Sequence, residues 1–258
     1  FDQILDRTHT KSLKYDFAVK RGKPADVLPF WVADMDFEIP PELKQILLDR
    51  VNHGVFGYTE SDDEYFDVLQ NWFSTRFNWT PEQRWLVKTP GIVFALAMAV
   101  RAFTKEGEGV LINQPVYYPF SMVIEDNNRR LINVPLIKGE ERYTIDFEGI
   151  ERAIVEANVT LFLLCNPHNP VGRVWTEDEL KRLGDICIKH NVLIVSDEIH
   201  ADFVWKGHTH KVFAALGESY AEHCIVCTAP SKTFNIAGLQ VSNIFIPNDS
   251  LRRRFIKE

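Results

Sequence analysis

An alternation of apolar runs and helical patterns between residues 109 and 229 most constrains the fold of this chain. Helix periodicity is clearest at 176–190, which opens with Thr176 and Glu179 at the spacing of a capping box. Each apolar run is short and lacks a polar face, as expected of strands buried in a parallel sheet. These runs are 109–114, 130–136, 159–165, 192–198 and 224–229. The pattern predicts an α/β fold with three layers, α/β/α, around a mostly parallel sheet.

The N-terminal region follows a different pattern. Residues 1–45 are expected to be irregular, because four prolines interrupt any long helix. Within them, "LPFWVADMDFEIPP" is dense in aromatic and acidic residues, which is typical of a segment ordered against a larger body. Helical patterns follow at 41–53, 63–77 and 92–104, and the last is apolar nearly all round, so we expect it to be buried.

Charge and composition exclude several classes of function. A net charge of −7 argues against nucleic-acid binding, which needs a clustered basic surface. No apolar run approaches the roughly 20 residues that span a bilayer, and no signal peptide is visible, although a removed leader stays open because the sequence begins at Phe1. The proportions of 45% hydrophobic and 25% charged residues are those of a soluble globular protein. We expect neither a nucleic-acid nor a membrane partner.

The four cysteines lie in apolar surroundings. Cys224 and Cys227 form a CxxC pair, which could indicate redox or zinc chemistry. The surrounding "HCIVCTA" has the pattern of a buried strand and no second pair accompanies it, so a structural role and no metal site are preferred. A reduced, cytoplasmic setting is expected.

Polar residues follow four of the predicted strands. Their segments are "PVYYPF" (115–120), "NPHNPVG" (166–172), "DEIH" (197–200) and "PSKTFN" (230–235). Because ligands of open α/β sheets collect beyond the carboxyl ends of the strands, these segments predict one polar rim. Asp197 and Lys232 on this rim suggest pyridoxal 5'-phosphate, which uses a Schiff-base lysine and an aspartate opposite its ring nitrogen. A strand-end lysine paired with an acid is the structural alternative.

Several motifs carry a resemblance to a known family. "NPHNPVG", "SDEIHADF", "APSKTFNIAGLQ" and "TPGIVFALA" resemble the fold-type I enzymes of the class I/II aminotransferase family, which depend on pyridoxal phosphate. "LPFWVADMDF" and "FGYTESDDEYFDVLQNWF" are similar to the MalY/PatB-like cystathionine β-lyases. The resemblance covers essentially the whole chain.

The resemblance implies a role for particular residues around the cofactor ring. Lys232 corresponds to the Schiff-base lysine and to the general base at Cα, Asp197 to the partner of the pyridine nitrogen, and Asn169 to the donor to the phenolic oxygen. Tyr117 corresponds to the aromatic stacked on the ring, and the adjacent Tyr118 is expected to point elsewhere. The implied catalytic set is Lys232, Asp197 and Tyr117.

The remaining implied contacts concern the phosphate and the edge of the cofactor. Backbone N–H groups at the start of a helix are suited to bind phosphate, and hydroxyls can add to them. The corresponding residues are Gly91, Ile92, Val93, Thr228 and Ser231. Tyr58 corresponds to a tyrosine that reaches the phosphate from a neighbouring subunit. This correspondence implies a homodimer with shared sites. The alternative is that Tyr58 is an ordinary core or interface tyrosine. His200 stands where relatives carry a cofactor-contacting tyrosine and could equally be structural, whereas His208 and His210 are expected in an exposed loop.

Two departures from the family pattern are visible. Gln240 stands where many aminotransferases carry a phosphate-binding arginine, which favours the lyase branch. Family members are longer, and the arginine that binds the substrate carboxylate lies in a C-terminal part that the chain does not contain. The resemblance therefore implies an N-terminal arm with part of a small domain at 1–50, and a large cofactor domain at 51–258.

The resemblance implies a carbon–sulfur β-lyase that cleaves cystathionine- or cysteine-type substrates to a thiol, pyruvate and ammonia. An aminotransferase shares the early steps and stays open, as does a cofactor-binding regulatory protein that acts through a partner.

Overall fold

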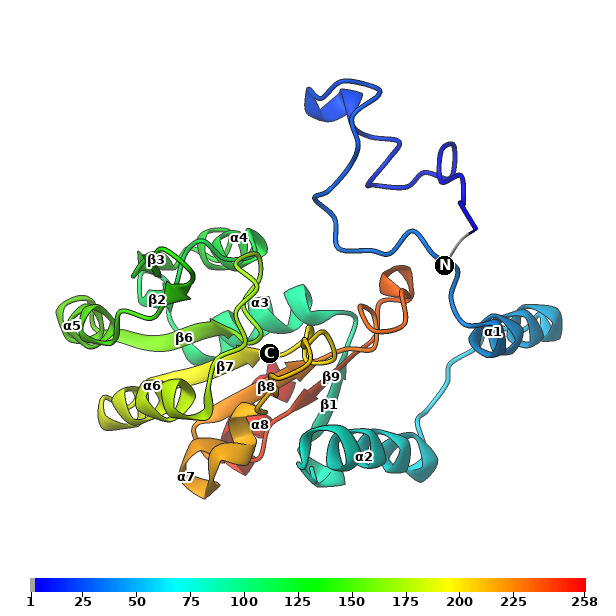
Figure 1. Cartoon of the computed structure of the whole chain (residues 1–258). Helices are drawn as coiled ribbons and strands as arrows, with labels where there is room; N and C mark the ends of the chain where they lie inside the picture. The colour runs from blue at the N-terminus through cyan, green and yellow to red at the C-terminus, as the bar shows by residue number, and fades with distance from the viewer. Residues whose placement is uncertain (1–2) are drawn as a thin grey trace. The chain divides into compact units, whose positions relative to one another are not determined.

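The computed structural model describes residues 3–258, which form two compact units (Figure 1). Unit 1 comprises the residues up to Thr59 together with Pro230–Leu239, and unit 2 comprises Glu60–Ala229 and Gln240–Glu258. The expected division into a 1–50 arm and a 51–258 cofactor domain stays a prediction.

Unit 2 is built on a seven-stranded sheet with the order β1-β9-β8-β7-β6-β2-β3. Pairings among β3, β2, β6, β7 and β8 are parallel, whereas β9 is antiparallel to both β8 and β1. The strands are β1 (Leu86–Thr89), β2 (Gly109–Ile112), β3 (Arg130–Asn133), β6 (Val159–Cys165), β7 (Leu193–Asp197), β8 (Cys224–Thr228) and β9 (Ser242–Phe245). A separate antiparallel pair joins β4 (Ile137–Lys138) and β5 (Tyr143–Thr144). The mostly parallel sheet is confirmed.

Helices cover both faces of this sheet. They are α2 (Asp63–Phe77), α3 (Ile92–Phe103), α4 (Pro119–Glu125), α5 (Phe147–Ala157), α6 (Glu177–Lys189), α7 (Glu218–Ala221) and α8 (Asp249–Lys257). Strand β6 shows the two-sided burial: Leu161 and Leu163 pack in one core with α3, α4 and α8, and Phe162 packs in the other with α2, α5 and α6. The α5 and α6 helices lie on one side of the sheet and α3 on the other, which confirms the three layers (Figure 1).

Most predicted elements form where the sequence placed them. The capping box of α6 is present, with Glu179 N–H donating to Thr176 Oγ1 (3.2 Å) and Thr176 N–H donating to the Glu179 carboxylate (2.8 Å). The burial expected of 92–104 is confirmed for much of α3, including Leu96 and Val100, but not for Val93 and Phe94, which are 41% and 46% exposed. Strands β1 and β9 lie outside the predicted set.

Unit 1 is largely irregular before α1 (Pro41–His53), apart from a short 3-10 turn at Val19–Arg21. The Arg7 guanidinium contacts Asp34 (2.9 Å) and Asp36 (2.6 Å), so the acidic residues of the "ADMD" stretch have a structural partner. The side chain of Asn235 binds the same stretch, accepting from Met35 N–H (2.9 Å) and donating to the Met35 carbonyl (3.0 Å). The N-terminal segment is thus ordered against the segment that contains Lys232.

Candidate functional site at the carboxyl edge of the sheet

The carboxyl ends of the parallel strands in unit 2 meet at one edge of the sheet. The β2 strand lies between β3 and β6, so the chain reverses its direction of progress across the sheet at β2. Such a topological switch point is where open α/β sheets bind ligands. The β1 strand is antiparallel to β9, and β9 is antiparallel to β8, so β1 and β8 run in the same direction. The loop after β1 therefore reaches the same edge.

Asp197 is the last residue of β7 and only 5% of it is exposed. In the strand register it pairs with Cys165 of β6 on one side and Cys227 of β8 on the other. Its carboxylate accepts a hydrogen bond from Ile199 N–H (3.1 Å). A buried carboxylate at the ligand-binding edge of such a sheet can pair with a cationic ligand atom.

Tyr117 and Tyr118 differ in burial. Tyr117 follows β2 and is half-buried, whereas Tyr118 is 58% exposed, and their ring centroids are 5.3 Å apart. Burial, followed by the nearby Tyr118 and the charge of Asp197, raises the pKa of the Tyr117 hydroxyl. The ring of Tyr117 therefore belongs to the same environment as the Asp197 carboxylate.

Asn169 lies in the loop after β6, half-buried at the switch point. Its backbone N–H donates to Cys165 Sγ at 3.3 Å, which holds the loop against the strand end. Its side-chain amide makes no hydrogen bond with another residue in the range 3–258. An amide in this state can donate to a ligand atom.

The turn between β1 and α3 has a conformation that requires glycine. Gly91 has φ +119° and ψ 156°, and no side chain caps α3 within the described part of the chain. Gly91 N–H donates to Ser242 Oγ (3.1 Å), and the same hydroxyl donates to the Thr89 carbonyl (3.0 Å). The N–H groups of Ile92 and Val93 follow in the first turn of α3, where a helix can bind an anion.

Ser242 is a site residue that the sequence reasoning missed. It opens β9, is fully buried, and holds the Gly91 turn from a strand far along the chain. The run "VSNIFI", rich in β-branched and aromatic residues, was a usable strand signal.

Thr228 ends β8 and is nearly buried, and its hydroxyl donates to the carbonyl of Asn243 (2.8 Å). The side chain of Asn243 in turn accepts from the Tyr65 hydroxyl (2.7 Å). The proton of the Thr228 hydroxyl is therefore engaged inside the protein, and its oxygen can accept a further hydrogen bond.

The other predicted site residues belong to unit 1. Lys232 Nζ donates to the Ala33 carbonyl at 2.8 Å. Ser231 is nearly buried, and its carbonyl accepts from Ile236 N–H (3.0 Å) in the turn that follows. Tyr58 is fully exposed.

The histidines correct one expectation. His208 is exposed, but His210 is buried, and its Nε2 lies 2.8 Å from the carboxylate of Glu198. Glu198 also accepts from the Ser196 hydroxyl and from Phe213 N–H, each at 2.9 Å. The placement of His210 in an exposed loop was wrong, because the loop after β7 folds back onto the sheet. His200 follows β7, and its ring lies 6.1 Å from that of Phe203.

The cysteines also have definite positions. Cys224 and Cys227 pack in the cores on opposite faces of the sheet, so their thiols point away from each other. Within residues 3–258 no group of three or more potential metal-ligating side chains occurs. No helix in the same range is long and apolar enough to cross a membrane.

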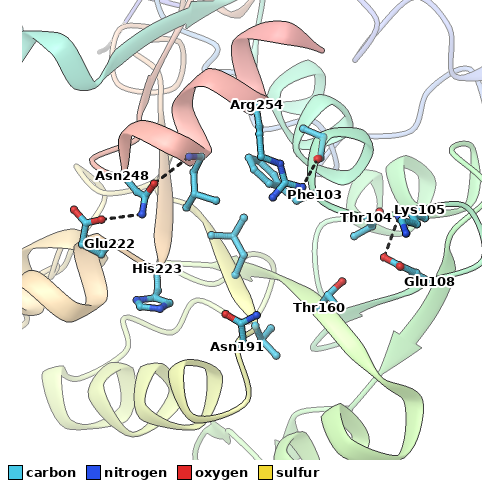
Figure 2. A pocket seen from close by; sticks show the side chains of 14 residues that line it. Phe103, Thr104, Lys105, Glu108, Thr160, Asn191, Glu222, His223, Asn248 and Arg254 are labelled. Carbon is cyan, nitrogen blue, oxygen red and sulfur yellow. Dashed lines mark hydrogen bonds between the residues drawn. The ribbon is translucent and has the colours of Figure 1, made fainter.

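A cavity of about 600 Å³ lies at the other edge of the sheet (Figure 2). Thr160, Asn191 and His223 line it near the amino ends of β6, β7 and β8, and Arg254 of α8 completes one side. Since ligands of such sheets bind at the carboxyl ends, the polar rim around Asp197 is the candidate site despite the size of this cavity.

Comparisons with known proteins identify the family of the chain. The model of the family "Aminotransferase class I and II" matches residues 25–257. Cystathionine beta-lyase PatB of Bacillus subtilis is 44% identical over 255 residues, which are 99% of this chain and 66% of PatB. The chain thus spans slightly less than two thirds of the length of this relative.

Two solved structures are similar over the whole of the chain. A PLP-bound putative aminotransferase from Clostridium difficile superposes with a TM-score of 0.96 and 44% identity, over 100% of this chain and 66% of that one. Cystalysin from Treponema denticola, which contains a pyridoxal 5'-phosphate cofactor, superposes with a TM-score of 0.93 and 42% identity. The match covers 99% of this chain and 65% of cystalysin. The resemblance inferred from the sequence motifs is confirmed, and this chain belongs to the class I and II aminotransferase family.

Proposed function

We propose that this chain forms the larger part of a pyridoxal phosphate-dependent carbon–sulfur β-lyase. Its substrates would be cystathionine- or cysteine-type amino acids, and its products a thiol, pyruvate and ammonia. The observation that carries the proposal is the buried Asp197 at the carboxyl edge of the sheet, with Tyr117 and Asn169 on the neighbouring loops. The similarity to a cystathionine β-lyase supports the type of reaction.

The residues at this edge fit pyridoxal phosphate by their chemistry. The buried carboxylate of Asp197 suits a protonated pyridine nitrogen, and the uncommitted amide of Asn169 suits a phenolic oxygen. The first turn of α3 at Gly91, Ile92 and Val93 suits a phosphate. When bound, the cofactor supplies an acceptor for the electron pair released at Cα of the substrate.

Further contacts are proposed for the remaining residues. Ser231 would donate a hydrogen bond to the phosphate. Thr228 would lie beside the phosphate, where its oxygen would accept a hydrogen bond from another group that binds the phosphate. His200 would lie at the edge of the cofactor. Tyr58 would reach the phosphate site of a second copy in a homodimer, and full exposure of its side chain is compatible with that contact.

Lys232 is proposed as the cofactor-binding amine and as the base. It follows Thr228, the last residue of β8, by four positions in the chain, and β8 is the strand next to β7 and Asp197. Lys232 would remove the proton at Cα, Asp197 would hold a proton at the pyridine nitrogen, and the Tyr117 ring would exclude water from one face of the cofactor. The substrate thiolate would then leave from Cβ, and water would hydrolyse the remaining three-carbon fragment to pyruvate and ammonia. A cytoplasmic location is part of the same proposal.

Titration of the natural full-length protein with pyridoxal phosphate tests the cofactor assignment. We expect a visible absorbance band that disappears in Lys232→Ala and persists in the control Lys206→Ala, which changes an exposed lysine. A wild-type protein without this band would contradict the proposal.

An aminotransferase is the second candidate, since one similar structure bears that name. Cystathionine supplied without a keto acid separates the two reactions. The lyase releases pyruvate and thiol, whereas an aminotransferase requires a keto acid and exchanges the amino group.

A further inference from the structure

We propose that His168 is a positioning residue that ties the loop of Tyr117 to the loop of Asn169 and so sets the width of the cofactor site. The proposal rests on the function proposed above. It assigns to the imidazole a role in holding two cofactor-facing residues, with no contact to the cofactor itself.

The ring of His168 spans the two loops at the switch point. Its Nε2 lies 3.0 Å from the carbonyl oxygen of Pro115, which precedes Tyr117 by two residues. His168 itself immediately precedes Asn169. The β2 and β6 strands that carry these loops are parallel neighbours, so the Nε2 contact joins the two loops just beyond the strand ends.

The position of the ring is fixed from several directions. The backbone N–H of His168 donates to the Arg173 carbonyl (2.7 Å), and its carbonyl accepts from Gly172 N–H (2.9 Å). The ring packs edge-on against Trp175 at 5.4 Å, and the Trp175 indole donates to the Cys165 carbonyl (3.0 Å). Only 3% of His168 is exposed. Because the ring is held in place, its hydrogen bond also fixes the position of the Pro115 carbonyl oxygen.

The chemistry of the contact identifies the hydrogen. A carbonyl oxygen can only accept, so Nε2 carries the proton and Nδ1 is the acceptor. Nδ1 is buried without a hydrogen-bond partner among the described residues. An apolar ring of the same shape would avoid that unpaired acceptor, so the feature that histidine adds here is the Nε2–H bond to Pro115.

The charge state of His168 keeps the contact intact at neutral pH. Burial lowers the pKa of His168 to about 4, and the nearby Arg173, whose guanidinium is bound by Glu179 at 2.7 Å, also disfavours a second proton. The carbonyls of Asn113, Pro115 and Cys165 face the ring and act in the opposite direction. The ring is therefore neutral at neutral pH, and the same tautomer holds the loops throughout.

Two substitutions separate the hydrogen bond from ring packing. His168→Phe keeps a ring and removes the donor, whereas His168→Gln places an amide N–H near the position of Nε2. In the full-length protein we expect His168→Phe to raise the dissociation constant of pyridoxal phosphate about 3- to 10-fold, the value of one net hydrogen bond. His168→Gln should recover most of this loss. His208→Phe, at an exposed histidine, is the matched control and should have no effect.

A double-mutant cycle tests whether the effect passes through Tyr117. If His168 positions that ring, His168→Phe should weaken binding less in a Tyr117→Ala background than in the wild type. Unchanged cofactor affinity in His168→Phe, or a loss that is fully additive with Tyr117→Ala and is not recovered by glutamine, would overturn the proposal.

Hydrogen exchange gives a readout without cofactor. We expect His168→Phe to speed amide exchange in both 114–118 and 166–170, and His168→Gln to restore protection. This result would support the His168 contact even if the wild-type protein failed to bind pyridoxal phosphate, an outcome that would refute the proposed function alone. Unchanged exchange at 114–118 would refute the contact itself.

Discussion

Asp197 and Cys165 are register partners on adjacent parallel strands, so the carboxylate and the thiol lie side by side at the carboxyl edge of the sheet. Cys227 takes the equivalent place on the other side of Asp197. Burial, followed by the charge of Asp197, raises the pKa of both thiols. The carboxylate is thus flanked by neutral groups.

We expect the thiols of the native protein to be unreactive, because burial keeps them protonated. All four cysteines are buried, and a thiol must lose its proton to attack a disulfide reagent. We expect no fast reaction with a chromogenic disulfide at pH 8 in the native protein, and four equivalents after unfolding in guanidinium. One rapidly modified thiol in the native protein would contradict this description.

Tyr117 and Tyr118 form a matched pair for testing the predicted stacking. Replacing the half-buried Tyr117 with alanine should weaken pyridoxal phosphate binding about 3- to 10-fold, the usual contribution of one aromatic contact. Tyr118→Ala, at a ring that is 58% exposed, should leave the dissociation constant unchanged. Equal losses in the two variants would count against the assignment of Tyr117.

Gly91→Ala should destabilise the protein through its backbone alone. A methyl group at Gly91 would meet no atom within 4 Å, but φ +119° lies in a region that side chains disfavour. We expect a loss of about 1–3 kcal/mol in the free energy of unfolding, measured with urea. Gly57→Ala, where space is also open, is the control. A fully stable Gly91→Ala would show that the turn tolerates a side chain.

His168 should make stability depend on pH. Burial lowers its pKa from 6.5 to about 4, so between these values the unfolded chain binds a proton that the folded chain does not. The contribution of His168 to the free energy of unfolding is therefore fully present above pH 6.5. The free energy of unfolding falls by up to about 3 kcal/mol as the pH drops toward 4. Urea unfolding at pH 7, 5.5 and 4.5 should show this slope in the wild type and a smaller one in His168→Gln. Parallel slopes would exclude His168 as the source.

The elements with strong local signals were predictable. The β6, β7 and β8 strands are continuous apolar runs, and α6 carries its own capping box, so each forms for reasons contained in a few adjacent residues. Directionality of the parallel sheet then brings Tyr117, Asn169 and Asp197 to one edge, since each follows or ends a strand.

Other features depend on residues far apart in the chain. Strands β1 and β9 have only four residues each and pair with each other across more than half of the sequence, so no local pattern connects them. Ser242 consequently reaches Gly91 through the folding of distant segments.

Periodicity predicted the layered α/β architecture, which the structure confirms, and the sequence motifs indicated the family. The architecture follows from local hydrophobicity and from the direction of successive strands, and the same order of strands predicts the rim of candidate residues. Burial of Asp197 between two thiols, the engaged proton of Thr228 and the contact between His168 and Pro115 emerged from packing. Each depends on which surfaces meet across the sheet, and that is a property of the whole core and not of any single segment.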